Sequence, residues 1–200
     1  AGNLSYRLIV DKRNQENAAS NLQFAGLYSA ASDTLNQNHN ASLSYAVSPN
    51  WMSENRFSYV RSHLMFPEND PDSPTVQVLG SFTFGGLSTF PQGRVANTFQ
   101  WQSVISRSAG RHLLKAGADI RRNRLYNLSQ FDAKGTWTFN NFTEFLNSQP
   151  SRLRHLLTDS SYDARQTGQA YFLQDSVRVA RTLSLDLGLR YELNSVPLDF

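Results

Sequence analysis

The sequence contains no cysteine among its 200 residues, which excludes disulfide bonds, thiol catalysis and cysteine-based zinc sites. It also lacks any apolar run approaching the roughly 20 residues that a membrane-spanning helix needs. Its net charge is only +3, and its lysines and arginines form no cluster that resembles a nucleic-acid footprint, so we expect no nucleic-acid partner. The first residues lack the basic start and apolar core of a signal peptide. We expect either that such a peptide has been removed or that the chain is an internal piece of a longer one.

What the sequence does contain is strict alternation, clearest in TLSLDLGLRYEL at Thr182–Leu193. Leucine and tyrosine occupy one parity, whereas serine, aspartate, glycine, arginine and glutamate occupy the other. A period of two predicts a β-strand, because successive side chains of a strand point to opposite faces. The stretch exceeds the usual soluble strand of about five or six residues. It matches the roughly 9 to 11 residues with which a tilted strand crosses a membrane.

Similar strand-like stretches recur along the chain. In RHLLKAGADIR, leucine, alanine and isoleucine again oppose lysine, glycine, aspartate and arginine. The eight predicted strands are Leu4–Asp11, Leu22–Ala30, Ala41–Ser48, Glu54–His63, Asn97–Ser106, Arg111–Arg121, Gly168–Val179 and Leu183–Leu193.

The connections between these strands alternate between short and long. Only PNWMS, RSAG and ART join the strands of three predicted hairpins, whereas Leu64–Ala96 and Arg122–Thr167 are long. A transmembrane meander has tight turns on the periplasmic side and long loops outside. We therefore predict an all-β fold, an antiparallel transmembrane β-barrel meander with long extracellular loops, in which residues 1–200 are part of one barrel domain.

The long loops are expected to carry structure of their own. Thr75–Phe84 and Gly135–Phe139 have the composition of strands. Asn140–Ser148 is predicted to form a short helix, because Asn141 suits the N-cap and Glu144 follows three residues later.

In such a barrel one parity would face lipid and the other a watery lumen. The residues predicted to face lipid are Leu114, Ile120, Leu183, Leu185, Leu187 and Leu189. Those predicted to line the lumen are Lys115, Asp119, Arg121, Asp186, Arg190 and Glu192. For Asp119 and Asp186 we expect ion pairs with arginine across strands rather than acid–base chemistry. Gly117 and Gly188 are expected to relieve crowding where strands coil.

Other groups of reactive side chains suggest no catalytic chemistry. Glu68, Asp70 and Asp72 could hold calcium, but their spacing is not that of an EF-hand, and a solvated acidic loop is the default. The histidines are scattered without ligand spacing, at His39, His63, His112 and His155. No nucleophile triad or phosphate-binding loop is present. We expect neither an enzyme nor a bound cofactor or metal.

Several stretches together resemble the barrel of TonB-dependent outer-membrane transporters, in the Oar-like branch that carries a carboxypeptidase-regulatory-like N-terminal domain. The similar pieces are SLSYAVSPNWMSENRFSYVRS, GRHLLKAGADIRR, GTWTFNNFTEFLNSQP and YFLQDSVRVARTLSLDLGLRYE. The last is the most specific, through its QD, an arginine, a short turn and LxLxLGLRYE. One departure is Ser176–Val177, where such barrels usually carry an aromatic residue after the QD.

The resemblance implies location in the outer membrane of a Gram-negative bacterium and a 22-stranded barrel, of which this chain would be roughly a third. It also implies a plug domain and a TonB box that lie N-terminal to the barrel, and hence the TonB complex, outer-membrane lipid and an unidentified solute as partners. Loop residues expected to contact solute, or else to pack the loops together, are aromatic or arginine: Trp137, Phe139, Phe142, Phe145, Arg152 and Arg154.

Two other architectures remain open at this stage. A complete eight-stranded outer-membrane barrel would close with a packed interior. A soluble carbohydrate-binding β-sandwich would bury the leucine rows against a second sheet. A third of a ring would leave two bare edges, so in the preferred interpretation the chain is not stable alone.

Overall fold

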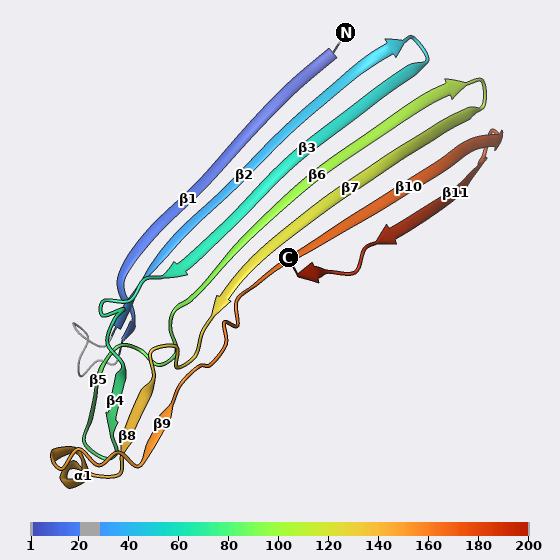
Figure 1. The fold of residues 1–200 in the computed structure, drawn as a ribbon. Helices are drawn as coiled ribbons and strands as arrows, with labels where there is room; N and C mark the ends of the chain where they lie inside the picture. Colours follow the sequence, from blue (N-terminus) through green and yellow to red (C-terminus); the bar gives the residue numbers. More distant parts are fainter. Residues whose placement is uncertain (1, 21–28, 200) are drawn as a thin grey trace.

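The computed structural model describes residues 2–20 and 29–199, and its main feature is one long antiparallel sheet (Figure 1). We call this sheet the wall. Its long strands lie side by side in chain order, and β12 (Leu198–Asp199) pairs with β10. The long strands are β1 (Gly2–Ser20), β2 (Ser29–Ser48), β3 (Trp51–Phe66), β6 (Gln92–Ala109), β7 (His112–Ser129), β10 (Tyr162–Ala180) and β11 (Leu183–Asn194).

The predicted alternation of connections is confirmed. Two-residue turns at 49–50, 110–111 and 181–182 join the strands at one end of the wall. The long connections 67–91 and 130–161 lie at the other end (Figure 1). We call these the turn end and the loop end.

The number of predicted strands needs a correction around β2. Leu22–Ala30 lies largely outside the described residues, and its last two residues open β2 rather than a separate strand. The alternation pattern does not predict a strand at residues 31–40, because they carry few apolar side chains. The ladder nevertheless continues through them, since Asn36 and Asn38 are paired with both β1 and β3.

Most strands of the wall are longer than a membrane requires. Six of them contain 16 to 20 residues, whereas roughly 9 to 11 tilted residues cross the hydrocarbon layer. A strand of 18 residues is about 59 Å long at about 3.3 Å per residue. The surplus lies toward the loop end, because the turn-end connections are only two residues long.

The register carries the alternation from strand to strand, so the wall has two chemically different faces. On one face Trp101 lies opposite Phe57 on β3 and Ile120 on β7, and Leu173 lies opposite Leu189. This apolar face contains all six residues predicted to face lipid. In the part of the chain that the structure describes, no second sheet covers it, and Leu189 is 76% exposed.

The apolar face also contains hydrogen-bonded polar side chains. Ser103 donates through Oγ to Asn55 Oδ1 (2.9 Å), and Asn55 Nδ2 donates to Ser53 Oγ (3.1 Å). Mutual hydrogen bonds lower the cost of placing such groups in an apolar environment. They explain why the alternation of Asn97–Ser106 is interrupted at Ser103.

A second, smaller sheet lies beyond the loop end (Figure 1). Its order is β5 (Phe82–Gly85), β4 (Thr75–Val78), β8 (Thr136–Phe139) and β9 (Arg152–Arg154), with β4 and β8 parallel. The single strand predicted at Thr75–Phe84 is wrong: Gly80, at φ +73°, turns the chain back, and Ser81 N donates to Val78 O (3.1 Å).

The predicted helix is confirmed as α1 (Phe142–Leu146). Asn141 caps it, since its side chain accepts a hydrogen bond from Glu144 N (2.9 Å). The Glu144 carboxylate in turn accepts from Asn140 N (2.9 Å), which satisfies a backbone donor just ahead of the helix. No helix in residues 2–20 and 29–199 is long and apolar enough to span a membrane.

The two-faced wall predicts how a charge is tolerated at neighbouring positions of β2. Leu43 lies on the apolar face and Ser44, one residue on, lies on the opposite face. We expect Leu43→Arg to lower the free energy of unfolding by about 2 to 4 kcal/mol, because a cation near mid-bilayer loses its hydration. Ser44→Arg should change it by less than about 0.5 kcal/mol.

The measurement is guanidinium unfolding of the natural protein in lipid vesicles, followed by tryptophan fluorescence. Equal destabilisation by the two arginines would mean that the two faces do not meet different solvents.

Candidate functional site: the polar face of the wall

The other face of the wall, which we call the polar face, is the candidate functional surface. Register places all six residues predicted to line the lumen on it, from β7 and β11. Asp119 lies opposite Gln102 and Ala170, and Arg121 lies opposite Gln100 and Gly168. The polar face therefore presents hydrogen-bonding groups on strand after strand.

Several grooves follow the strands on this face, including one of about 630 Å³ at the turn end. Two of them lie along the middle of the strands: the larger, of about 680 Å³, lies over β1, β2, β3 and β6, and the smaller, of about 360 Å³, lies over β7, β10 and β11. The larger is lined in part by Arg7, Asn40, Ser42, Arg56, Gln100 and Gln102. The smaller is lined in part by Asp119, Arg121, Asn123, Arg190, Glu192 and Asn194. Both are open surfaces rich in donors and acceptors.

The prediction of ion pairs with arginine across strands is wrong for both Asp119 and Asp186, since no salt bridge within residues 2–20 and 29–199 involves either. The Asp119 carboxylate instead accepts hydrogen bonds from Gln100 Nε2 (2.8 and 3.0 Å) and Gln102 Nε2 (3.0 Å) on β6. Two arginines of this face pair along their own strand, Arg190 with Glu192 and Arg56 with Glu54. Residues two apart in a strand share a face, and the cross-strand neighbour of Arg190 is Phe172, which offers no carboxylate.

The residues that line the larger groove were not among the predicted lumen residues. Gln100 and Gln102 belong to NTFQWQSVIS, in which the aromatic residues of the other parity give the stronger signal. Their alternation with Phe99 and Trp101 along the same strand predicts that they share the other face. Arg7 and Asn40 could have been found only from the pairing of β1 with β2, which brings them opposite one another.

Gly117 and Gly188, both on the polar face, differ in their surroundings. A Cβ on Gly117 would lie 2.3 Å from Phe172 Cε1 and 2.9 Å from the Ser103 carbonyl oxygen. The Phe172 ring therefore covers Gly117, in agreement with the expected relief of crowding. A Cβ on Gly188 would meet nothing closer than the Leu173 carbonyl oxygen at 3.5 Å, so crowding does not explain that glycine.

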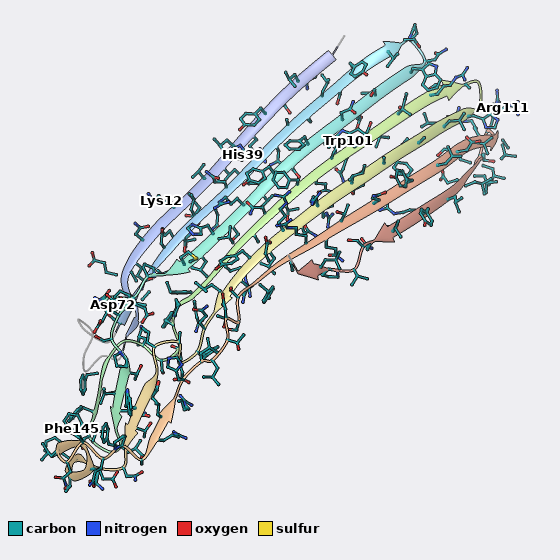
Figure 2. All side chains as sticks on the ribbon, viewed as in Figure 1. Lys12, His39, Asp72, Trp101, Arg111 and Phe145 are labelled. Carbon is teal, nitrogen blue, oxygen red and sulfur yellow. The ribbon has the colours of Figure 1, made fainter. Side chains whose placement is uncertain are left out.

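The residues predicted as loop contacts lie in the small sheet and α1, and they divide by burial. Phe139 is buried, and the Phe145 ring lies 5.4 to 6.1 Å from Phe139, Phe142, Phe82 and Phe84 (Figure 2). These rings hold α1 against the sheet. The other predicted contacts are exposed: Trp137, Phe142, Arg152 and Arg154.

The acidic loop is not simply solvated at Glu68. This carboxylate is buried, pairs with Lys134 and accepts a hydrogen bond from Leu87 N (3.2 Å). Asp70 caps its own turn by accepting from Ser73 N (3.2 Å). Within residues 2–20 and 29–199, no three histidine or carboxylate side chains gather into a set that could hold a metal. The ion pair fastens the two long loop segments together.

The covered glycine gives a prediction on the polar face. Gly117→Ala should destabilise the barrel by about 1 to 3 kcal/mol, because the new methyl group overlaps the Phe172 ring and a backbone oxygen. Gly188→Ala is the matched control and should change stability by less than about 0.5 kcal/mol. Adding Phe172→Ala to Gly117→Ala should recover part of the loss in a double-mutant cycle of unfolding free energies. Identical effects of the two glycine substitutions would refute the packing argument.

A second prediction concerns Asp159, which lies in the loop ahead of β10. The Ser161 N–H (2.8 Å), the Gln130 amide (2.5 Å) and the Ser161 hydroxyl (2.9 Å) all donate to its carboxylate and lower its pKa. Since the pKa of Asp159 is lowered on folding, these three hydrogen bonds stabilise the loop fully above the ordinary carboxyl pKa of about 4. Their contribution is lost as the pH falls through the lowered pKa.

Digestion with an acid-active protease measures the stability of this loop, because Leu157, two residues before Asp159, is 92% exposed. We expect Asp159→Ala to be cleaved faster than the natural protein at pH ~5 and at a similar rate once Asp159 is protonated. A ratio of cleavage rates that stays constant with pH would contradict it.

Comparison with known proteins adds the family. No curated protein matches the chain. No solved structure matches it either. A family model described as an outer membrane beta barrel domain matches residues 1–199, which is nearly the whole chain and agrees with the two-faced antiparallel wall. The chain therefore belongs to the outer membrane beta barrel domain family, whose place is the outer membrane of Gram-negative bacteria.

Proposed function

We propose that this chain is a barrel segment of a TonB-dependent transporter of the Oar-like kind, which takes up a solute across the outer membrane. The observation that carries the proposal is the wall itself, because it stays open at both edges while its polar face is grooved and rich in hydrogen-bonding groups. In the proposal the apolar face contacts outer-membrane lipid and the polar face lines the lumen.

The open edges favour a larger ring. In the described residues, the outer edges of β1 and β11 have no strand beside them. Unpaired backbone groups are too costly in hydrocarbon, so further strands have to complete the barrel. A ring of about 22 strands has a lumen wide enough to hold a plug, whereas a ring of about eight is filled by its own side chains.

The chemistry of the polar face suits a wide, occupied lumen. Arg121, Arg190 and Glu192 line an open groove rather than a packed apolar interior. Such a surface can bind the backbone and polar side chains of a plug through direct and water-mediated hydrogen bonds. In this proposal the segment is not an enzyme and needs no cofactor. Energy reaches it from the inner membrane through the TonB complex and the plug.

The small sheet beyond the loop end is placed to meet the solute first. Trp137, Phe142 and Arg152 are exposed there, and such side chains stack on and pair with ligands. Arg154 is partly engaged, since its Nε donates to Asp132 Oδ2 (3.2 Å). Phe139 and Phe145 instead pack against each other and hold α1 on the small sheet.

The absence of cysteine in these 200 residues allows a direct test with single-cysteine variants of the natural protein, any cysteine elsewhere being replaced by serine. A membrane-impermeant maleimide added to cells should label Asp119→Cys, and faster when the TonB complex is present and energised, because plug movement opens the lumen. Leu187→Cys, on the apolar face, is the matched control and should stay unlabelled.

Labelling of Asp119→Cys at the same rate in cells lacking TonB would contradict the transport proposal.

The alternative of a small complete barrel predicts a different result for residues 1–200 alone. If residues 1–200 alone refold in detergent into a heat-modifiable monomer, then the chain closes by itself and is not a segment of a larger ring.

A further inference from the structure

The apolar face carries a row of aromatic rings toward the loop end. Tyr6, His39, Tyr59 and Phe99 follow one another across β1, β2, β3 and β6, with ring centroids 6.3, 5.6 and 4.8 Å apart. The Tyr6 hydroxyl lies 2.7 Å from His39 Nδ1. Aromatic side chains with a polar edge collect where membrane hydrocarbon meets headgroups. The row therefore marks the outer boundary of the apolar band.

Cationic side chains begin where this aromatic row ends. Phe99 lies opposite Arg122 on β7, and one step further toward the loops Asn97 lies opposite both Arg61 and Arg124. Arg124 lies opposite Arg165 on β10. Figure 2 shows Lys12 on β1 nearer the loop end than His39 on β2. We call this set the basic belt; its members are Lys12, Arg61, Arg122, Arg124 and Arg165.

The acids near the basic belt balance only part of its charge. Asp163 pairs with Arg165 (2.9 Å), and Asp33 lies on the same face one level beyond Lys12. Arg61 donates through Nη1 to Asn97 Oδ1 (3.1 Å). Among residues 2–20 and 29–199, no salt bridge involves Arg61, Arg122 or Arg124.

The placement of two arginines directly opposite each other also favours an anion. Like charges facing one another across strands repel, and Arg124 and Arg165 are such a pair, in which Asp163 already pairs with Arg165. A further anion bound by Arg124 and its neighbour on the same face, Arg122, would offset the remaining positive charge. Arginine suits the task because its planar group binds phosphate through two parallel hydrogen bonds.

We propose that the basic belt binds the phosphate-bearing headgroup of a lipid in the outer leaflet. The belt lies on the apolar face, just beyond the aromatic row, at the depth where headgroups meet the barrel. A lumen ligand would not reach this face, and a soluble anion would gain nothing from the neighbouring apolar band. The proposal rests on the lipid-facing assignment of the apolar face and not on transport, so it survives if uptake proves independent of TonB.

The test compares two double variants of the full natural protein, purified from outer membranes. Arg122→Gln with Arg124→Gln removes two cations from the basic belt. Arg94→Gln with Arg121→Gln is the matched control, since it removes two exposed arginines of β6 and β7 from the polar face. The probe is phosphatidic acid in phosphatidylcholine nanodiscs, and native mass spectrometry counts the retained phosphatidic acid molecules. We expect at least about tenfold weaker retention for the belt variant and unchanged retention for the control.

Two further arms keep the result decisive. Arg122→Lys with Arg124→Lys keeps the charge but not the paired hydrogen bonds, so it should fold and retain an intermediate amount of lipid. Inorganic phosphate at millimolar concentration should not displace the lipid, because the acyl chains add to its binding. Equal retention by the belt variant and the control, or full displacement by inorganic phosphate, would overturn the proposal.

Discussion

The structure depends on one constraint, which is that every peptide group inside a membrane must find a hydrogen-bond partner in the protein. The wall satisfies this constraint with continuous antiparallel ladders. β7, for example, is paired along its length with β6 on one side and β10 on the other. Because the ladders fix the register, each side chain is committed to one face. A shift of one residue would exchange the two faces of a strand, so backbone pairing and side-chain sorting support each other.

Charged side chains therefore have different partners on the two faces of the wall. On the polar face, carboxylates are held by neighbours two residues away or by amides, as Asp119 is by Gln100 and Gln102. On the apolar face near the turn end, His112 and Asp175 meet across strands at 2.7 Å, and Arg107 lies 5.1 Å from the Trp51 ring centroid. Charge thus appears on the apolar face mainly at its ends, where hydrocarbon gives way to headgroups and water.

Beyond the loop end the physical problem changes, because water again surrounds the chain. The loops fold there as a small module with buried contacts of its own, in which Glu68 and Lys134 form an ion pair and Phe145 packs among other aromatic rings. Breaking a buried pair by removing one partner is costly, so the two long connections are constrained to act as one body. In the proposed transporter this outer module would be the part of the chain that meets the solute first.

Most of the strands, the two faces and the order of short and long connections can be predicted from the sequence, because a period of two and turn residues are local properties. The same holds for α1, because Asn141 and Glu144, which form its N-terminal cap, lie within four residues of each other. Four features became visible only in the fold: the unbroken length of β2, the hairpin at Gly80, the amide partners of Asp119 and the packing of Phe172 over Gly117. Except for the Gly80 hairpin, which joins two strands adjacent in the chain, each of these depends on which residues lie opposite one another across strands. Alternation within one strand carries no information about that register.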